Sequence, residues 1–107
     1  MAFYIKQNDT SPYLVATLQD GDGQSIDLTS SSVVFKMRPV GISTPKVDRA
    51  AVIQSENSGI VRFEWQSSDT DTMGSYEAEF EVTHSDNTIE TFPNASFIRV
   101  TITDDIS

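Results

Sequence analysis

The chain has 107 residues and no cysteine, and its 16 Asp and Glu residues against 7 Lys and Arg give a formal net charge of −9. This length supports a single domain over residues 1–107, and the lack of cysteine excludes disulfides, thiolate zinc sites and cysteine nucleophiles. The acidic balance argues against nucleic acid as a partner, and no apolar stretch approaches the roughly 20 residues of a membrane span, so no membrane partner is expected.

Short runs in which apolar and polar residues alternate recur along the chain, separated by clusters of Gly, Pro, Asn, Asp and Ser. This period of two residues is typical of β-strands with one buried face. In chain order, the expected strands are Phe3–Lys6, Tyr13–Gln19, Ser32–Arg38, Val47–Gln54, Ile60–Gln66, Ser75–His84, Thr88–Phe92 and Phe97–Thr103. The sequence thus predicts an all-β fold, an immunoglobulin-like antiparallel β-sandwich of about seven to nine strands.

The same alternation assigns side chains to faces, because successive residues of a strand point to opposite sides of the sheet. The residues expected in the core are Leu14, Ala16, Leu18, Val33, Phe35, Met37, Val61, Phe63, Trp65, Tyr76, Ala78, Phe80, Val82, Ile98, Val100 and Ile102. Trp65 shares its phase with Val61 and Phe63, which favours a core position over an exposed platform for sugars.

Turn residues mark the connections between the expected strands. Asp20–Gly23 predicts a tight turn, and Asn57–Gly59 predicts a short hairpin loop. The two prolines and the glycine between Arg38 and Pro45 predict an exposed irregular loop. Tyr76 stands where immunoglobulin-like domains carry a tyrosine corner, so we expect its hydroxyl to bond to the backbone upstream.

A series of segments forms a pattern over nearly the full length of the chain. The segments are Phe3–Pro12, Ala16–Gly23, Ile26–Thr29, Val33–Arg38, Gly59–Trp65, Asp69–Val82 and Thr91–Pro93. In this order they resemble the amino-terminal domain family of baseplate upper proteins from tailed bacteriophages. The resemblance implies a structural module of the tail or baseplate, made in the host cytoplasm and located in the virion. It also implies attachment to other phage virion proteins, in multiple copies in a symmetric assembly, without an active site.

Two other functions are compatible with the same fold. A sandwich of this kind can decorate the phage head (capsid) instead of the tail, because attachment modules are reusable. A host carbohydrate-binding module is less favoured, since it requires an exposed aromatic platform or a loop organised by calcium.

Candidate metal and catalytic residues are few. Asp20 and Asp22 lack the remaining ligands of a calcium loop, and Asp69 and Asp71 suit the cap of a helical turn. His84 is the single histidine, and we expect it to be exposed at the end of a strand. We therefore expect no metal site, no cofactor, no catalytic residue and no enzymatic activity.

The residues expected to contact a partner lie on the first strand, near a turn and along one strand face. Alternation predicts that Glu77, Glu79 and Glu81 form an outward acidic stripe, which is either solvated or in contact with a basic partner. The first strand can also pair with a neighbour's exposed sheet edge. The candidate interface residues are Phe3, Tyr4, Ile5, Tyr13, Glu77, Glu79 and Glu81.

Overall fold

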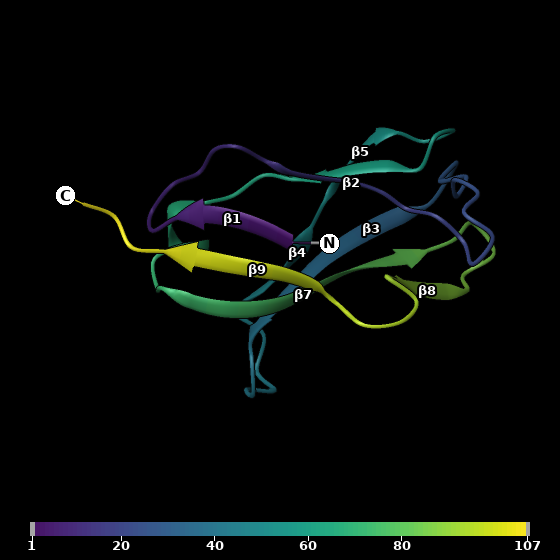
Figure 1. The fold of residues 1–107 in the computed structure, drawn as a ribbon. Helices are drawn as coiled ribbons and strands as arrows, with labels where there is room; N and C mark the ends of the chain where they lie inside the picture. Colours follow the sequence, from purple (N-terminus) through teal and green to yellow (C-terminus); the bar gives the residue numbers. More distant parts are fainter. Residues whose placement is uncertain (1, 107) are drawn as a thin grey trace.

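A computed structural model, which describes residues 2–106, arranges the chain as two β-sheets packed face to face (Figure 1). The elements in chain order are β1 (Ala2–Lys6), β2 (Leu14–Thr17), β3 (Ser32–Pro39), β4 (Val47–Ala50), β5 (Val52–Ser55), β6 (Ile60–Phe63), the 3-10 helix η1 (Ser67–Asp69), β7 (Gly74–Thr83), β8 (Ile89–Phe92) and β9 (Ile98–Thr103). The predicted all-β sandwich is therefore confirmed. Within residues 2–106, no helix is long and apolar enough to cross a membrane.

The strands divide unequally between the two sheets. The large sheet is six-stranded, with the order β1-β9-β7-β3-β4 and with β8 paired to β7 beyond the end of β9. The small sheet is three-stranded, with the order β2-β6-β5. Among the described strands, all pairings are antiparallel except that of β1 with β9, which is parallel.

Every residue that the alternation assigns to the core is buried. At the centre, Phe35 of β3 stacks on Phe63 of β6 with ring centroids 4.2 Å apart, and Phe80 of β7 packs against Phe35 at 5.1 Å. Trp65 lies edge-on to Phe63 and stacks on Phe3 of β1. Such aromatic pairs contribute about 0.5–1.5 kcal/mol each beyond their buried area. The cluster therefore joins the two sheets.

Two features of the core differ from the sequence-based expectation. The expected strand Val47–Gln54 is two strands, with β4 in the large sheet and β5 in the small sheet. The chain crosses between the sheets at Ala51, whose N–H donates to the backbone oxygen of Val33 at 2.9 Å. Leu28 and Phe92 are also buried, although the sequence assigns neither of them to the core, because each lies outside the long alternating runs.

The predicted turns form as expected. Asp20 Oδ1 accepts hydrogen bonds from the N–H groups of Asp22 at 2.9 Å and Gln24 at 3.0 Å, so this carboxylate stabilises its own turn. The Tyr76 hydroxyl donates to the backbone oxygen of Thr72 at 2.6 Å, which confirms the tyrosine corner. Burial raises the pKa of Tyr76 above its ordinary value, so the hydroxyl keeps the proton that it donates.

Gly59 is the last residue of the hairpin turn between β5 and β6, and its backbone conformation is unfavourable for residues with a side chain. Its φ is +66°, in the left-handed region. A Cβ atom at this position would lie 2.7 Å from the backbone oxygen of Ile26 and 2.9 Å from that of Leu18. Because backbone atoms cannot move aside as a flexible side chain can, this position requires glycine.

We expect Gly59→Ala to lower the free energy of unfolding by about 2 kcal/mol, since a left-handed non-glycine residue and the backbone overlap both oppose the native state. The measurement is urea denaturation followed by tryptophan fluorescence. Gly21→Ala is the matched control, because no heavy atom lies within 4 Å of a Cβ atom there. Equal losses for the two variants would contradict the prediction.

Candidate binding surface

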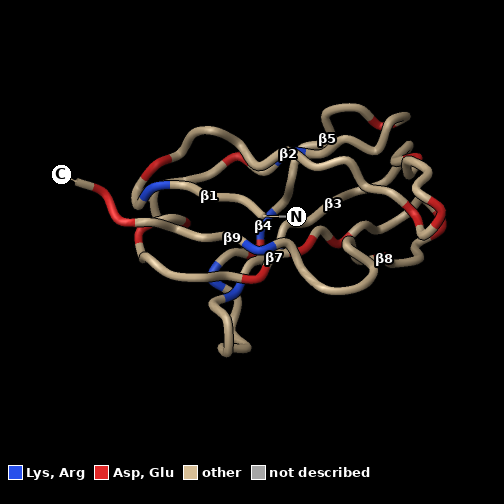
Figure 2. The backbone as a smooth tube through the Cα atoms, in the orientation of Figure 1, with Lys and Arg blue, Asp and Glu red and all other residues tan. Residues whose placement is uncertain are grey.

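Charged residues of both signs cover the outer face of the large sheet. On β7, Glu77, Glu79 and Glu81 alternate with buried residues and point outward. Lys36 and Arg38 point outward from the adjacent strand β3. Figure 2 shows Lys and Arg gathered where β3, β7 and β9 lie side by side, whereas Asp and Glu also mark the loops beyond β8. The predicted acidic stripe is therefore part of a mixed charged face.

Two of the three glutamates on this face have cationic partners on β3. Lys36 Nζ lies 3.2 Å from Glu81 Oε2, and Arg38 Nε lies 3.3 Å from Glu77 Oε1. The hydrogen bond to Glu81 raises the pKa of Lys36 above its ordinary value. Both pairs are partly exposed, so each contributes about 1 kcal/mol at most. These pairs offset the repulsion that a row of three carboxylates would otherwise produce.

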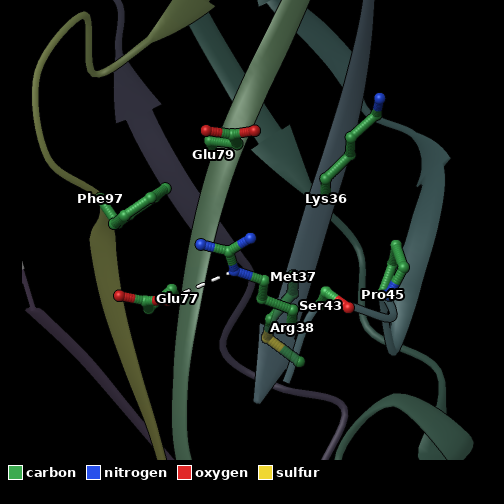
Figure 3. A pocket seen from close by; sticks show the side chains of 8 residues that line it. All are labelled: Lys36, Met37, Arg38, Ser43, Pro45, Glu77, Glu79 and Phe97. Atoms are coloured by element: carbon green, nitrogen blue, oxygen red, sulfur yellow. Dashed lines mark hydrogen bonds and ion pairs between the residues drawn. The ribbon is translucent and has the colours of Figure 1, made fainter. Parts of the chain in front are cut away.

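A shallow pocket of about 110 Å³ lies beside the third glutamate (Figure 3). Glu79 makes no ion pair and no side-chain hydrogen bond with any residue of the described chain. Phe97 is 39% exposed, and the Arg38 guanidinium lies 5.2 Å from the centre of its ring. The lining residues are Lys36, Met37, Arg38, Ser43, Pro45, Glu77, Glu79 and Phe97. Lys36 lies opposite Glu79 in the strand register and interacts with it electrostatically, but its hydrogen bond goes to Glu81. The pocket thus combines a carboxylate that makes no ion pair with an aromatic ring that Arg38 already covers.

The predicted interface residues do not form one surface. Tyr4 is 67% exposed and shares the outer face of the large sheet with the three glutamates. Tyr13 is 46% exposed but lies just before β2 of the small sheet, where Arg62 is 5.8 Å from its ring centre. Phe3 is half-buried against Trp65, and Ile5 is in the core. Because these two side chains face inward, the parts of β1 that remain accessible to a partner are mainly its backbone edge and Tyr4.

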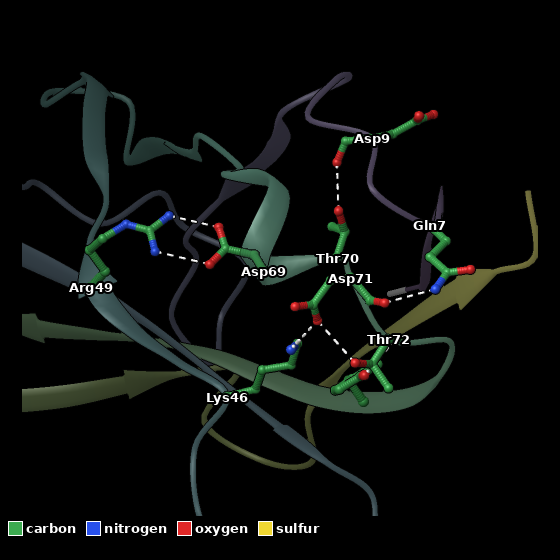
Figure 4. Close-up of polar contacts among 9 residues, drawn as sticks. Gln7, Asp9, Lys46, Arg49, Asp69, Thr70, Asp71 and Thr72 are labelled. Carbon is green, nitrogen blue, oxygen red and sulfur yellow. Dashed lines mark hydrogen bonds and ion pairs between the residues drawn. The ribbon is translucent and has the colours of Figure 1, made fainter.

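A network of polar contacts, the polar corner, surrounds η1 (Figure 4). At its centre, Arg49 of β4 donates from both terminal nitrogens to the two oxygens of Asp69, at 3.0 and 2.8 Å. Asp69 is buried and also accepts a bond from the Gln66 N–H at 2.6 Å. The bond to Asp69 raises the pKa of Arg49. The sequence placed Asp69 at a helical cap but gave no signal of its pairing with Arg49, which lies twenty residues earlier.

Asp71, the second carboxylate of the predicted pair, has a different cation. Lys46 Nζ lies 2.7 Å from its Oδ1 atom, which also accepts a bond from the Thr72 hydroxyl. The bonds from Lys46 and Thr72 hold the pKa of Asp71 below its ordinary value of 3.8. The adjacent Thr70 donates from its hydroxyl to the backbone oxygen of Asp9 at 2.8 Å. The polar corner therefore ties β4, η1 and the segment after β1 together, which is a structural role.

His84 is partly buried rather than exposed as expected, and its Nε2 atom lies 3.0 Å from Glu90 Oε1 on the adjacent β8 strand. Across residues 2–106, no group of three or more His, Cys, Asp or Glu side chains is placed to hold a metal ion. Asp20 and Asp22 remain turn residues, and Asp69 and Asp71 bind cationic side chains.

The matches to known proteins are in three-dimensional structure. No protein family and no curated protein matches the chain. Among solved structures, the crystal structure of CopC from Methylosinus trichosporium OB3b matches with a TM-score of 0.52 and 15% sequence identity, over 99% of this chain and 87% of the CopC chain. At this identity the likeness shows the fold alone.

These comparisons correct the function expected from the sequence. The solved structure described above is of CopC, and no family or curated match connects the chain with a baseplate, tail or capsid. The expected roles as a tail module or head decoration protein, with the host carbohydrate-binding alternative, are therefore set aside. Resemblance in the order of short segments was a weak basis for them, because such segments recur wherever strands and turns alternate. The baseplate-family resemblance itself stays an interpretation of the sequence.

We expect Lys46→Met to raise the pKa of Asp71 toward 3.8, because the variant removes the largest cause of the lowered value. A lowered pKa stabilises the fold above pH 3.8, and this contribution is lost as the pH falls through the folded-state pKa. As the pH falls below 3.8, the free energy of unfolding should therefore decrease less in the variant than in the wild type.

The measurement is an NMR titration of the side-chain carboxyl carbons, together with melting temperatures at acid pH. Lys6→Met is the control, since the Lys6 ammonium donates to the backbone oxygen of Asp104 instead. An unchanged titration midpoint for Asp71 in Lys46→Met would contradict the assignment.

Proposed function

We propose that this chain is a non-catalytic protein-binding domain that contacts its partner through the outer face of the large sheet. The observation that carries the proposal is the contrast among three neighbouring glutamates. Glu77 and Glu81 are paired with cations, whereas Glu79 has no such partner and lines a pocket beside the exposed Phe97. A pocket carboxylate that makes no ion pair suits the side chain of a partner's Lys or Arg.

The rest of the face supports a protein partner. Tyr4 is an exposed aromatic residue on the same face, and tyrosine is enriched at protein interfaces. Arg99 of β9 is also exposed and makes no ion pair within residues 2–106, so both signs of charge are available for a complementary surface. A net charge of −9 disfavours a phosphate backbone.

Binding is proposed in preference to catalysis because the chain offers little for proton transfer or nucleophilic attack. It has one histidine and no cysteine. His84 is hydrogen-bonded to Glu90 at the far end of β7, away from the pocket beside Glu79. The large sheet is also an open surface, which does not exclude water as an active site does.

The experiment compares wild type, Glu79→Lys and Glu56→Lys as baits on beads, with extracts of the cells that produce the protein. We expect Glu79→Lys to lose at least about tenfold in affinity for the captured partner, or about 1.4 kcal/mol, since the new ammonium repels the partner's cation. Affinity is then measured by titration with the purified partner.

Glu56→Lys is the matched control, because it makes the same change of charge on the exposed hairpin between β5 and β6. Circular dichroism and melting curves verify that all three baits are folded. Equal affinity of the partner for the two variants, or no protein enriched by the wild type over bare beads, would refute the proposal.

A further inference from the structure

The open edge of the small sheet is formed by β2. Within the described chain, β2 pairs with β6 on one side and with no strand on the other. The Leu18 N–H donates to the Gly59 oxygen, and alternate residues of a strand direct their backbone groups to the same side. The N–H and C=O groups of Val15 and Thr17 therefore point away from β6, toward the open edge.

An apolar groove runs along this edge. It has a volume of about 210 Å³ and lies between β2 of the small sheet and the β8–β9 region of the large sheet. In Figure 1 these elements belong to opposite layers, and no strand of the small sheet lies beyond β2. The lining residues are Ala16, Thr17, Leu18, Gln19, Phe92, Pro93 and Ile98. A strand added beside β2 would cover this gap.

We propose that β2 accepts an extended segment of a partner protein as a fourth strand of the small sheet. The free groups of Val15 and Thr17 supply the backbone hydrogen bonds, and every second side chain of the segment enters the groove. Aliphatic side chains suit it, because apolar area removed from water contributes about 25 cal/mol per Å². This site is on the other sheet from Glu79 and does not depend on the function proposed above.

The negative charge near the β2 edge indicates which kind of partner segment would bind there. The turn that follows β2 carries Asp20 and Asp22, and both residues lie close in sequence to the groove residue Gln19. A second copy of this chain would bring another net charge of −9 to the edge, so pairing of β2 with itself is disfavoured. The segment therefore has apolar residues at every second position and ends in Lys or Arg.

The edge of β1 is a weaker candidate for strand addition. The hollow beside it is lined in part by the charged residues Lys6 and Asp9. Burying these groups without partners would cost free energy, which the apolar groove beside β2 avoids.

The test uses the peptide Lys-Thr-Val-Thr-Val-Thr-Lys and amide NMR spectra of the whole chain. We expect shifts that centre on Val15 and Thr17, and at least about tenfold slower hydrogen exchange of these two amides at a peptide concentration of about 1 mM. The same peptide with Glu at both ends should bind at least several-fold more weakly at low salt, because of the carboxylates in the turn.

Two variants isolate the backbone contribution. Thr17→Pro removes the outward N–H without touching the bonds between β2 and β6, since proline is tolerated where the N–H faces the open side of an edge strand. It should abolish peptide binding, whereas Thr17→Val, which keeps the N–H, should preserve it. Glu79→Lys should bind the peptide as the wild type does, so failure here is distinct from failure of the proposed function.

Three results would overturn the proposal. The first is that the amide signals of Val15 and Thr17 do not shift when the folded protein is mixed with an excess of the peptide. The second is equal binding of the two peptides, which would remove the preference for basic ends. The third is a concentration-dependent dimer in sedimentation that Thr17→Pro abolishes, which would identify a second copy as the occupant of the edge.

Discussion

The stacking of Phe35 on Phe63 joins the two sheets, and the direction of every neighbouring side chain follows from it. Because Phe35 points inward from β3, Val34 and Lys36 must point outward. A slip of one residue would place Lys36 in the centre of an aromatic cluster and Phe35 in water. The same contact therefore sets both the register of the core and the position of the charged face on the opposite side of the sheet.

Most carboxylates near the turns and corners have structural partners. Asp27 and Asp86 each accept bonds from the N–H and the hydroxyl of the threonine two residues later, and these bonds lower the pKa of both. Asp69 and Asp71 hold the polar corner through Arg49 and Lys46. Glu79, like Asp22, Asp48 and Glu56, makes no ion pair within the described chain, but among these four it lines the pocket beside Phe97.

Periodicity predicted those parts of the fold that depend on local sequence. The buried strands around Phe35 and Phe80 follow from alternation alone, and so does the outward direction of Glu79. By contrast, Phe3 and Ile5 lie on a short terminal strand whose inner face is defined by its pairing with β9. Alternation shows that the two share a face but not which face is buried.

Other features depend on contacts between distant residues. The burial of Asp69 in η1 requires Arg49, which lies twenty residues earlier in β4. Glu79 makes no ion pair because Lys36 and Arg38 of β3 pair with Glu81 and Glu77 instead, and the pattern of a single strand does not show this.

The parallel pairing of β1 with β9 also affects the order in which the strands assemble, since Ile5 lies opposite Ile102. The paired residues of β1 and β9 are far apart in sequence, and contacts of such long sequence separation form slowly. The hairpins involve shorter sequence separations, so we expect β1 to join the large sheet after they have formed.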